Sequence, residues 1–340
     1  MMRYELSLGI DMSKLTFDYS LLSSTGEVLA QGNEENEPKT ILNWIKGIES
    51  IVGECNESLV ICMEDMGYYG ASILRALKSK KTGVIWLESS LQIKRSIGIT
   101  RGKTDKIDSE RIAMYALDYQ RRLVEWSPKP KSIERLSLLV SHRDRLVKKK
   151  QSIEVPLKEQ KAYTELSIQE ELEGINNKII SSLAEGIEIL NSKIEEVLKT
   201  EDNFKKQTEI IRSIPGFGPV IASKLILFTE GFSKIKTARK LACYAGVAPF
   251  EYSSGTSIKG KTRVSHIANK NLKKMLHLAA LVTIRKGHVM YGYYQRKIKE
   301  GKNKMSIINA IRNKLIHILM ACIKNDTMYQ KNYKHSLVIT

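Results

Sequence analysis

Four acidic residues in the first third of the chain have the types and spacing of a metal site. Asp11 ends the apolar stretch of GIDMSK, and Glu64 ends that of VICMED. Asp105 and Asp108 are three residues apart, so in a helix they project from one face. Divalent cations such as Mg²⁺ or Mn²⁺ prefer carboxylate oxygens. A pair of such ions would activate a nucleophile and stabilise the leaving oxygen in phosphodiester cleavage.

The joint pattern of these acids is the informative feature, because a single exposed carboxylate at a strand end is common. Two neighbouring acids, Asp65 and Asp118, are set aside. Asp65 follows Glu64 directly, and successive side chains of a strand point to opposite faces.

An α/β layer must position the four acids. Strands are predicted within residues 4–31 as a hairpin and at 58–65 and 82–89, and helices at 38–53, 72–80 and 104–123. Thr104 is the expected N-cap of the last helix. This alternation predicts a mixed sheet in an α/β domain over residues 1–127, with the acids at the C-terminal edge of its strands.

Residues 128–203 have the pattern of long helices, with an expected interruption at Pro156. Apolar residues recur from Ile168 to Leu198 at steps of three and four, with Glu and Lys between them. A coiled coil buries such a stripe between chains, which would make the segment an oligomerisation element. An intramolecular helix pair buries it equally well.

A mainly α-helical region is predicted at 204–325, followed by a tail at 326–340. Within it, residues 210–226 read IIRSIPGFGPVIASKLI, which is typical of a helix-hairpin-helix. Gly216 and Gly218 would let the backbone approach a DNA phosphate at the start of the second helix. The alternative is a glycine-rich corner between helices with only a packing role.

Positive charge is concentrated at the C-terminal end. The whole chain has a net charge of +18, and from residue 232 onward it has 22 Lys and Arg against 3 Asp and Glu. Such a balance favours nucleic acid as a partner, with an anionic membrane surface as the weaker alternative. The residues expected to contact phosphate are Lys259, Lys261, Arg263, Lys270, Lys273 and Lys274.

Other features exclude a membrane or secreted protein. No apolar run reaches the roughly 18 residues that a membrane-spanning helix needs, and Glu5 and Asp11 interrupt any leader-like stretch. The four cysteines are scattered with no CxxC pair, which predicts reduced thiols in the cytoplasm.

A serine in the predicted basic loop at 249–271 is a candidate nucleophile. Ser253-Ser254-Gly255 lies beside lysines and an arginine that would stabilise charge developing on phosphorus. Ser-Gly pairs are also ordinary loop residues. His266 and His277 show no metal-ligand spacing, so we interpret them as packing or phosphate contacts.

The order of these motifs resembles a known family. GIDMSK, MEDMG, RGKTDKIDSERIA, IPGFGPVIASKLI, FSKIKTARKLACYAGVAPFEYSSG and SHIANKNLKKMLHLAA follow one another as in the DEDD transposases of insertion-sequence family 110, relatives of the Piv-type DNA invertases. The resemblance covers about residues 4–325. It implies a RuvC-like (RNase H-like) N-terminal domain whose four acids are Asp11, Glu64, Asp105 and Asp108, then coiled-coil helices and a C-terminal transposase domain.

The resemblance also implies a mechanism and partners. A serine, Ser254 or its neighbour Ser253, would attack a phosphodiester at a composite site to give a phosphoserine intermediate. A structured bridge RNA would pair with double-stranded donor and target DNA, and the protein would act as a dimer or tetramer, bound to the nucleoid in a prokaryotic cytoplasm.

Two departures from the family pattern concern its phosphate contacts: Phe250 replaces a commoner basic residue, and Asn269 lies in a variant IANKN stretch. Two other function classes stay open. One is a RuvC-like metal-dependent nuclease or Holliday-junction resolvase that uses water, and the other is a nucleic-acid-binding protein without activity.

Overall fold

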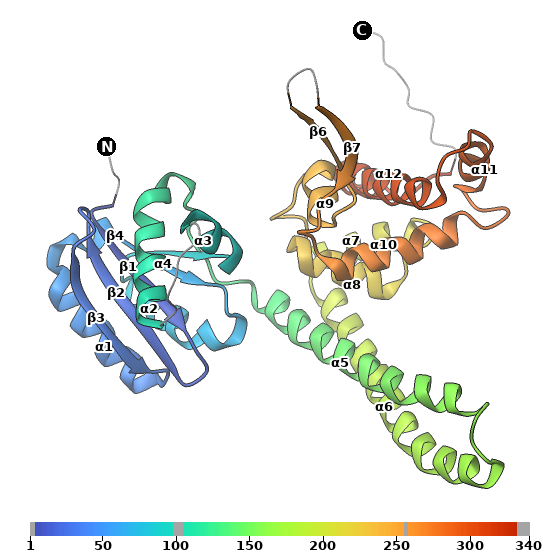
Figure 1. Cartoon of the computed structure of the whole chain (residues 1–340), viewed down its shortest axis with the longest axis horizontal. Coiled ribbons are helices and arrows are strands. Elements are labelled where there is room, and N and C mark those ends of the chain that lie inside the picture. Colours follow the sequence, from blue (N-terminus) through green and yellow to red (C-terminus); the bar gives the residue numbers. More distant parts are fainter. Residues whose placement is uncertain (1–3, 98–104, 255–257, 332–340) are drawn as a thin grey trace. The chain divides into compact units, whose positions relative to one another are not determined.

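A computed structural model describes residues 4–97, 105–254 and 258–331 of the chain (Figure 1). A few side chains inside these ranges, among them those of Asp105, Ser253, Ser254, Lys259 and Lys261, also lie outside the description. The chain forms two compact units, Met1–Pro128 and Lys129–Thr340.

The first unit contains a five-stranded sheet in the order β3-β2-β1-β4-β5 (Figure 1). Its strands are β1 (Leu6–Met12), β2 (Thr16–Ser23), β3 (Val28–Glu35), β4 (Leu59–Glu64) and β5 (Val84–Glu88). The first three strands form an antiparallel meander, while β4 pairs parallel with both β1 and β5. The predicted mixed sheet is confirmed, with one more strand in the N-terminal meander than the hairpin that the sequence suggested.

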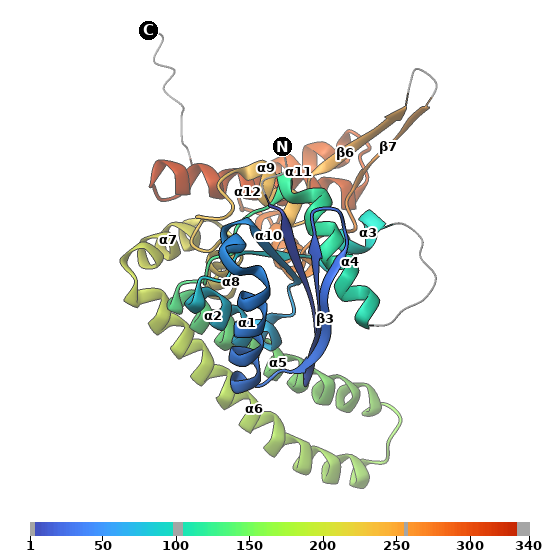
Figure 2. The same cartoon turned by 90° about the vertical axis from the view of Figure 1, so that its left-hand side faces the viewer.

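Helices cover both faces of the sheet (Figure 2). Helix α1 (Pro38–Val52) and helix α2 (Ala71–Lys80) share an apolar cluster with strand residues such as Leu8 and Ile61. On the other face, α3 (Ser90–Ile97) and α4 (Asp105–Tyr119) pack on Cys62 and Trp86. Short 3₁₀ turns lie at η1 (Gly53–Ser58), η2 (Gly67–Gly70) and η3 (Gln120–Arg122).

Gly9 fixes where α4 crosses the sheet. A Cβ atom at this position would lie 2.1 Å from the carbonyl oxygen of Ser109, so the helix backbone rests directly on β1. The Ser7 hydroxyl donates to the carbonyl oxygen of Ala113 at 2.8 Å. Residues further along β1 therefore lie nearer the N-terminus of α4.

The second unit begins with two long antiparallel helices, α5 (Lys131–Gln160) and α6 (Leu166–Thr200) (Figure 1). They pair with each other within the chain, which is the alternative to an intermolecular coiled coil that the sequence left open. The predicted interruption at Pro156 is wrong, because α5 continues through it. Proline removes one helical N–H, and the exposed Ser152 one turn earlier lets water satisfy the released carbonyl.

The rest of this unit is mainly helical, as predicted. It consists of α7 (Asp202–Ser213), α8 (Pro219–Thr229), α9 (Ala238–Tyr244), β6 (Pro249–Ser254), β7 (Ile258–Val264), α10 (Lys270–Thr283), α11 (Tyr291–Lys299) and α12 (Lys304–Asn325). One apolar core joins these helices to the ends of α5 and α6 at residues such as Val140 and Ile194. The sequence-based division at 203/204 stays a prediction.

Strands β6 and β7 form an antiparallel hairpin where the sequence suggested an irregular loop over 249–271. The β-forming residues Phe250, Tyr252, Ile258 and Val264 account for this difference.

Among the described helices, α12 is long and apolar enough to cross a membrane by composition. Its apolar residues Ile311, Leu315 and Leu319 are fully or almost fully buried in the core of the unit, and it packs on α10. Its apolar character is therefore that of a core helix.

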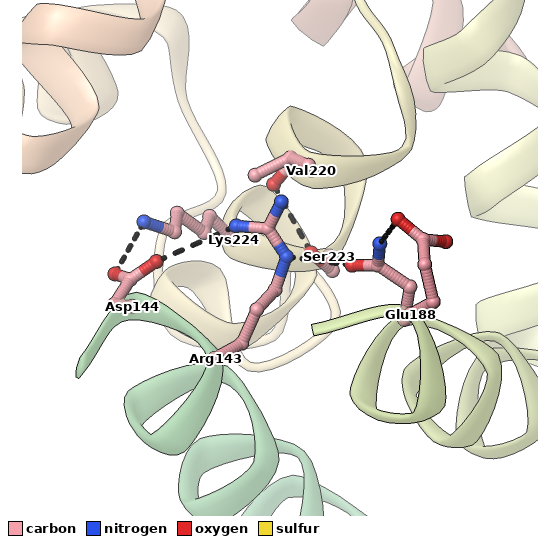
Figure 3. Close-up of polar contacts among 7 residues, drawn as sticks. Arg143, Asp144, Glu188, Val220, Ser223 and Lys224 are labelled. Atoms are coloured by element: carbon pink, nitrogen blue, oxygen red, sulfur yellow. Dashed lines mark hydrogen bonds and ion pairs between the residues drawn. The ribbon is translucent and has the colours of Figure 1, made fainter. Parts of the chain in front are cut away.

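A polar network connects the helix pair to α8 (Figure 3). Lys224 of α8 binds Asp144 of α5, with 2.5 Å between Nζ and Oδ2. Arg143 donates from Nε to Asn191 Oδ1 at 2.6 Å, and Asn191 in turn donates to Glu188 of α6. Charged and amide groups thus link the three helices α5, α6 and α8.

Candidate active site

Asp11 and Glu64 lie on adjacent parallel strands. Ile10 of β1 pairs with Met63 of β4, so Asp11 and Glu64 are the next positions in register. Asp11 is two residues from Gly9 and therefore on the same face of β1, the face that α4 covers. Glu64 shares its face with Cys62, which also packs under α4.

The N-terminal end of α4 lies over this part of the sheet. Asp105 is the first residue of α4, and Asp108 directly precedes Ser109, whose carbonyl oxygen is closest to Gly9. The elements that carry the four predicted acids thus meet at one end of β1. The side chain of Asp105 itself lies outside the described residues.

The acids have partners of their own. Asp108 accepts from Arg111 at 3.0 Å, with both side chains about one-fifth exposed. Glu64 Oε2 accepts from the hydroxyl of Ser90 at the start of α3. Within the described part of the chain, no three His, Cys, Asp or Glu side chains come together as a metal-binding group.

Glu88 is a further acid that the sequence analysis missed. It pairs with Glu64 across β4 and β5, so the two carboxylates share one face. Tyr115 of α4 donates to Glu88 at 3.2 Å. Burial and then the Glu88 carboxylate raise the pKa of Tyr115 to about 12. The signal was present, because Glu88 ends a buried strand just as Glu64 does.

The donor chemistry of this end of the sheet fits a divalent cation. In the described part of the chain, neither Glu64 nor Glu88 forms a salt bridge. Burial raises the pKa of the Cys62 thiol, and the carboxylates of Glu88 and Glu64 raise it further. Among the described residues, Glu64 and Glu88 thus have no cationic partner, and oxygen ligands of this kind suit Mg²⁺ or Mn²⁺.

The serine motif lies at the tip of the β6–β7 hairpin. Ser254 is the last residue of β6 and pairs with Ile258. Gly255 and the side chains of Ser253, Ser254, Lys259 and Lys261 lie outside the described residues. Arg263, on β7, is exposed. Arg263, the basic side chain of this hairpin that the structure describes, is therefore accessible to solvent.

The two glycines between α7 and α8 differ in their surroundings. Gly216 has a φ of 85°, and a Cβ atom there would lie 2.7 Å from the carbonyl oxygen of Ala279 in α10. Gly218 is the N-cap of α8, and no atom of the described residues lies within 4 Å of its Cβ position. Packing therefore accounts for Gly216, while the backbone at Gly218 is open. Phosphate binding at either glycine stays a prediction.

The predicted lysines of α10 lie at its N-terminal end. Asn269 caps the helix, since its Oδ1 accepts from the Leu272 amide at 2.9 Å. Lys270 and Lys274 are exposed, and Lys273 is half-buried. Their spacing places them along one side of the helix.

Comparison with known proteins identifies the family. A model of DEDD transposases of IS110, described as "Transposase", matches residues 8–159, and one described as "Transposase IS116/IS110/IS902 family" matches residues 208–295. The chain belongs to the IS110 family of DEDD transposases. The family match supports a DNA recombinase enzyme with DNA as its substrate.

Similarity to two pilin gene-inverting proteins extends over nearly the whole transposase chain, and similarity to an insertion-element protein extends over part of it. The pilin gene-inverting protein of Moraxella bovis is 26% identical over 95% of this chain and 97% of its own. Its counterpart from Moraxella lacunata has the same identity and coverage. The IS900 42 kDa protein of Mycobacterium paratuberculosis is 29% identical over 44% of this chain and 39% of its own. DEDD transposases as a family use divalent metal, which agrees with the oxygen-donor chemistry of the acidic end of the sheet.

Proposed function

We propose that this IS110-family transposase cleaves and exchanges strands of double-stranded donor and target DNA, using its acids and a serine nucleophile. The observation that carries the proposal is the meeting of Asp11, Glu64 and the N-terminus of α4 on one face of the sheet. We assign a RuvC-like fold to the first unit, Met1–Pro128, and a helix-hairpin-helix to the α7–α8 segment. The acids Asp11, Glu64, Asp105 and Asp108 would hold Mg²⁺ or Mn²⁺, which supplies Lewis-acid stabilisation at phosphorus.

The proposed chemistry balances as a transesterification. The Ser254 hydroxyl loses its proton and attacks phosphorus, the bond from phosphorus to the 3′ oxygen breaks, and that oxygen leaves as a 3′-hydroxyl. The 5′-phosphate stays on the serine. A 3′-hydroxyl from another strand then attacks the phosphoserine and releases the serine, so no phosphodiester is lost. Arg263, Lys259 and Lys261 would stabilise negative charge on the phosphoryl oxygens.

A structured guide RNA and self-association complete the proposal. The strongly basic C-terminal part of the chain, with 22 Lys and Arg against 3 Asp and Glu from residue 232, suits nucleic-acid phosphates. On α6, Ile168, Ile175 and Ile179 are 48%, 55% and 46% exposed, which favours a second copy of the chain at this stripe in a dimer or tetramer. The protein would work in the cytoplasm, on the nucleoid.

One experiment separates the serine mechanism from hydrolysis by water. Purified protein is incubated with end-labelled DNA carrying both element ends and with RNA that co-purifies with it, and covalent adducts are resolved on a denaturing gel. We expect an adduct with wild type, none with Ser254→Ala, and retention with Ser253→Ala. Wild-type strand exchange by Ser254→Ala would contradict the serine assignment and leave a water-using nuclease or resolvase.

Sequencing the RNA that co-purifies in the same preparation tests whether a specific RNA guides the protein. We expect one structured species encoded beside the gene. Recovery of random cellular RNA alone would contradict guidance without affecting the serine result.

A further inference from the structure

Arg312 of α12 is a buried cation that has no carboxylate partner among the described residues. Its residue is 6% exposed, and no salt bridge reaches it within the described ranges. From residue 232 onward the chain has only three acids, of which Glu300 binds Lys297 and Asp326 binds Lys206. The Nε of Arg312 is buried and has no hydrogen-bond partner in the part of the chain that the structure describes. A guanidinium held this way is costly to bury, so its position calls for a role.

The guanidinium of Arg312 acts on His277 of α10. Its Nη2 lies 3.0 Å from Nδ1 of the imidazole. Arginine has only donor groups, so Nδ1 must accept, and the ring is neutral with its proton on Nε2. Burial and then the charge of Arg312 lower the pKa of His277, which agrees with a neutral ring.

His277 extends the row of lysines on α10. It follows Lys270 by seven residues, Lys273 by four and Lys274 by three, so it lies on the same side of the helix. The His277 residue is half-buried. Its Nε2 atom is either accessible to solvent or hydrogen-bonded, because it is not one of the buried polar atoms without a partner. Since no hydrogen bond from Nε2 is found in the described part of the chain either, this atom faces solvent with a proton to donate.

We propose that neutral His277 donates its Nε2 proton to a phosphate oxygen of a nucleic-acid backbone, and that Arg312 is the positioning residue that sets this tautomer. The inference rests on the proposed function, because it takes nucleic acid as the ligand. A neutral ring held in place adds a directional hydrogen bond to the lysine row, whereas another lysine would add a further charge with freely rotating donors.

The other charged groups around His277 are occupied or lie on its own helix. Helix α8, which also packs on α10, has Lys224 as its one titratable side chain, and Asp144 binds it. On α12, Lys314 lies over the ring of Tyr293. Lys273 and Lys274 are the cations beside His277 on α10. None of these groups can accept a proton from the ring, so Arg312 decides the tautomer.

The first test compares two amides at position 277. In His277→Gln the side-chain amide reaches the place of Nε2, whereas in His277→Asn the shorter side-chain amide reaches only the place of Nδ1, where its oxygen can accept from Arg312. Affinity of the full-length protein is measured at fixed salt for a labelled DNA duplex and, separately, a labelled RNA hairpin. We expect His277→Asn to lose roughly tenfold in affinity and His277→Gln to keep wild-type affinity. The matched control is His288→Ala, which removes an exposed histidine.

The two probes identify the source of the phosphate. Loss with DNA alone assigns the contact to DNA, and loss with RNA alone assigns it to the RNA; either supports the inference. Wild-type affinity of His277→Asn for both probes would overturn it. If the wild type binds neither probe, the proposed nucleic-acid function fails, and the phosphate contact fails with it, whatever the ring tautomer.

The second test reads the tautomer directly and does not need a ligand. Nitrogen NMR of histidine-labelled protein is expected to show Nε2–H at His277 at neutral pH in the wild type and in Arg312→Lys. Arg312→Met frees Nδ1, so the pKa of His277 should rise and the DNA affinity of this variant should increase from about pH 8 to pH 6, unlike the wild type. A cationic ring or an Nδ1–H tautomer in the wild type would overturn the positioning role of Arg312.

Discussion

Lys224 of α8 and Asp144 of α5 form an ion pair in which the lysine side chain is almost fully buried. The Nζ–Oδ2 distance is 2.5 Å, and the Lys224 side chain is 7% exposed against 27% for Asp144 (Figure 3). Arg143 lies 3.7 Å from the other carboxylate oxygen, so Asp144 serves two cations. The ion pair links α5 of the helix pair to α8, the helix that Gly218 caps.

Removing one member of this pair should destabilise the second unit. Asp144→Leu leaves the buried Lys224 ammonium unpaired, and we expect a loss of about 3 kcal/mol in the free energy of unfolding. The double variant Asp144→Leu/Lys224→Met removes both charges and should recover much of that loss. Thermal unfolding measures the double variant and the two single variants, Asp144→Leu and Lys224→Met. A double variant as unstable as the sum of the single changes would contradict the pairing.

Gly9→Ala should disrupt the packing of α4 on β1. The new Cβ would lie 2.1 Å from the Ser109 carbonyl oxygen and 2.3 Å from the Ala113 amide nitrogen. Both are backbone atoms of α4, so the whole helix would have to shift to relieve the clash. We expect lower stability of the first unit and loss of strand cleavage, since the N-terminus of α4 moves away from Asp11. The control is Gly47→Ala in α1, where the added methyl meets no described atom within 4 Å. Alanine there should stabilise the helix by up to about 1 kcal/mol.

Two glycine variants separate packing from phosphate binding between α7 and α8. Gly216→Ala combines a positive φ with a contact of 2.7 Å to Ala279 O, so we expect a marked drop in thermal stability. Gly218→Ala has open space and an extended backbone, so stability should be kept. If the backbone at Gly218 approaches a phosphate, the DNA affinity of the Gly218→Ala variant should nevertheless fall. Unchanged affinity would leave this turn with a packing role only.

Local patterns in the sequence predicted the elements that carry the acids, because strand ends and helix faces follow from short-range periodicity. Asp11 and Glu64 could be placed at one sheet edge by this reasoning, and Glu88 could have been added by the same rule. The contact between Gly9 and Ser109 was out of reach, since it joins residues 100 positions apart. The partner of Lys224 was equally hidden, because nothing in its helix indicates which distant acid meets it.

Two local expectations also failed for physical reasons. Pro156 does not end α5, since the released carbonyl lies on an exposed turn and the chain continues in helical geometry. The segment around Ser254 forms a hairpin, although its Ser, Gly and Lys content is typical of a loop. At Pro156 the solvent context outweighs residue preference, whereas in the hairpin the β-forming residues such as Phe250 and Val264 outweigh the loop-forming ones.

Glu88 should contribute to metal binding although it lies outside the four acids of the family motif. It shares a face with Glu64 and, among described residues, has no cationic partner, so Glu88→Gln removes one negative charge from the acidic end of the sheet. Titration of metal-free protein with Mn²⁺ should show weaker binding for Glu88→Gln and for Glu64→Gln. Asp118→Asn is the matched control, because it removes an exposed carboxylate of the same unit from α4. Equal weakening by Asp118→Asn would mean that only overall charge matters. Wild-type Mn²⁺ affinity of Glu88→Gln, with reduced affinity of Glu64→Gln, would restrict the metal ligands to the family acids and leave Glu88 as the partner of Tyr115.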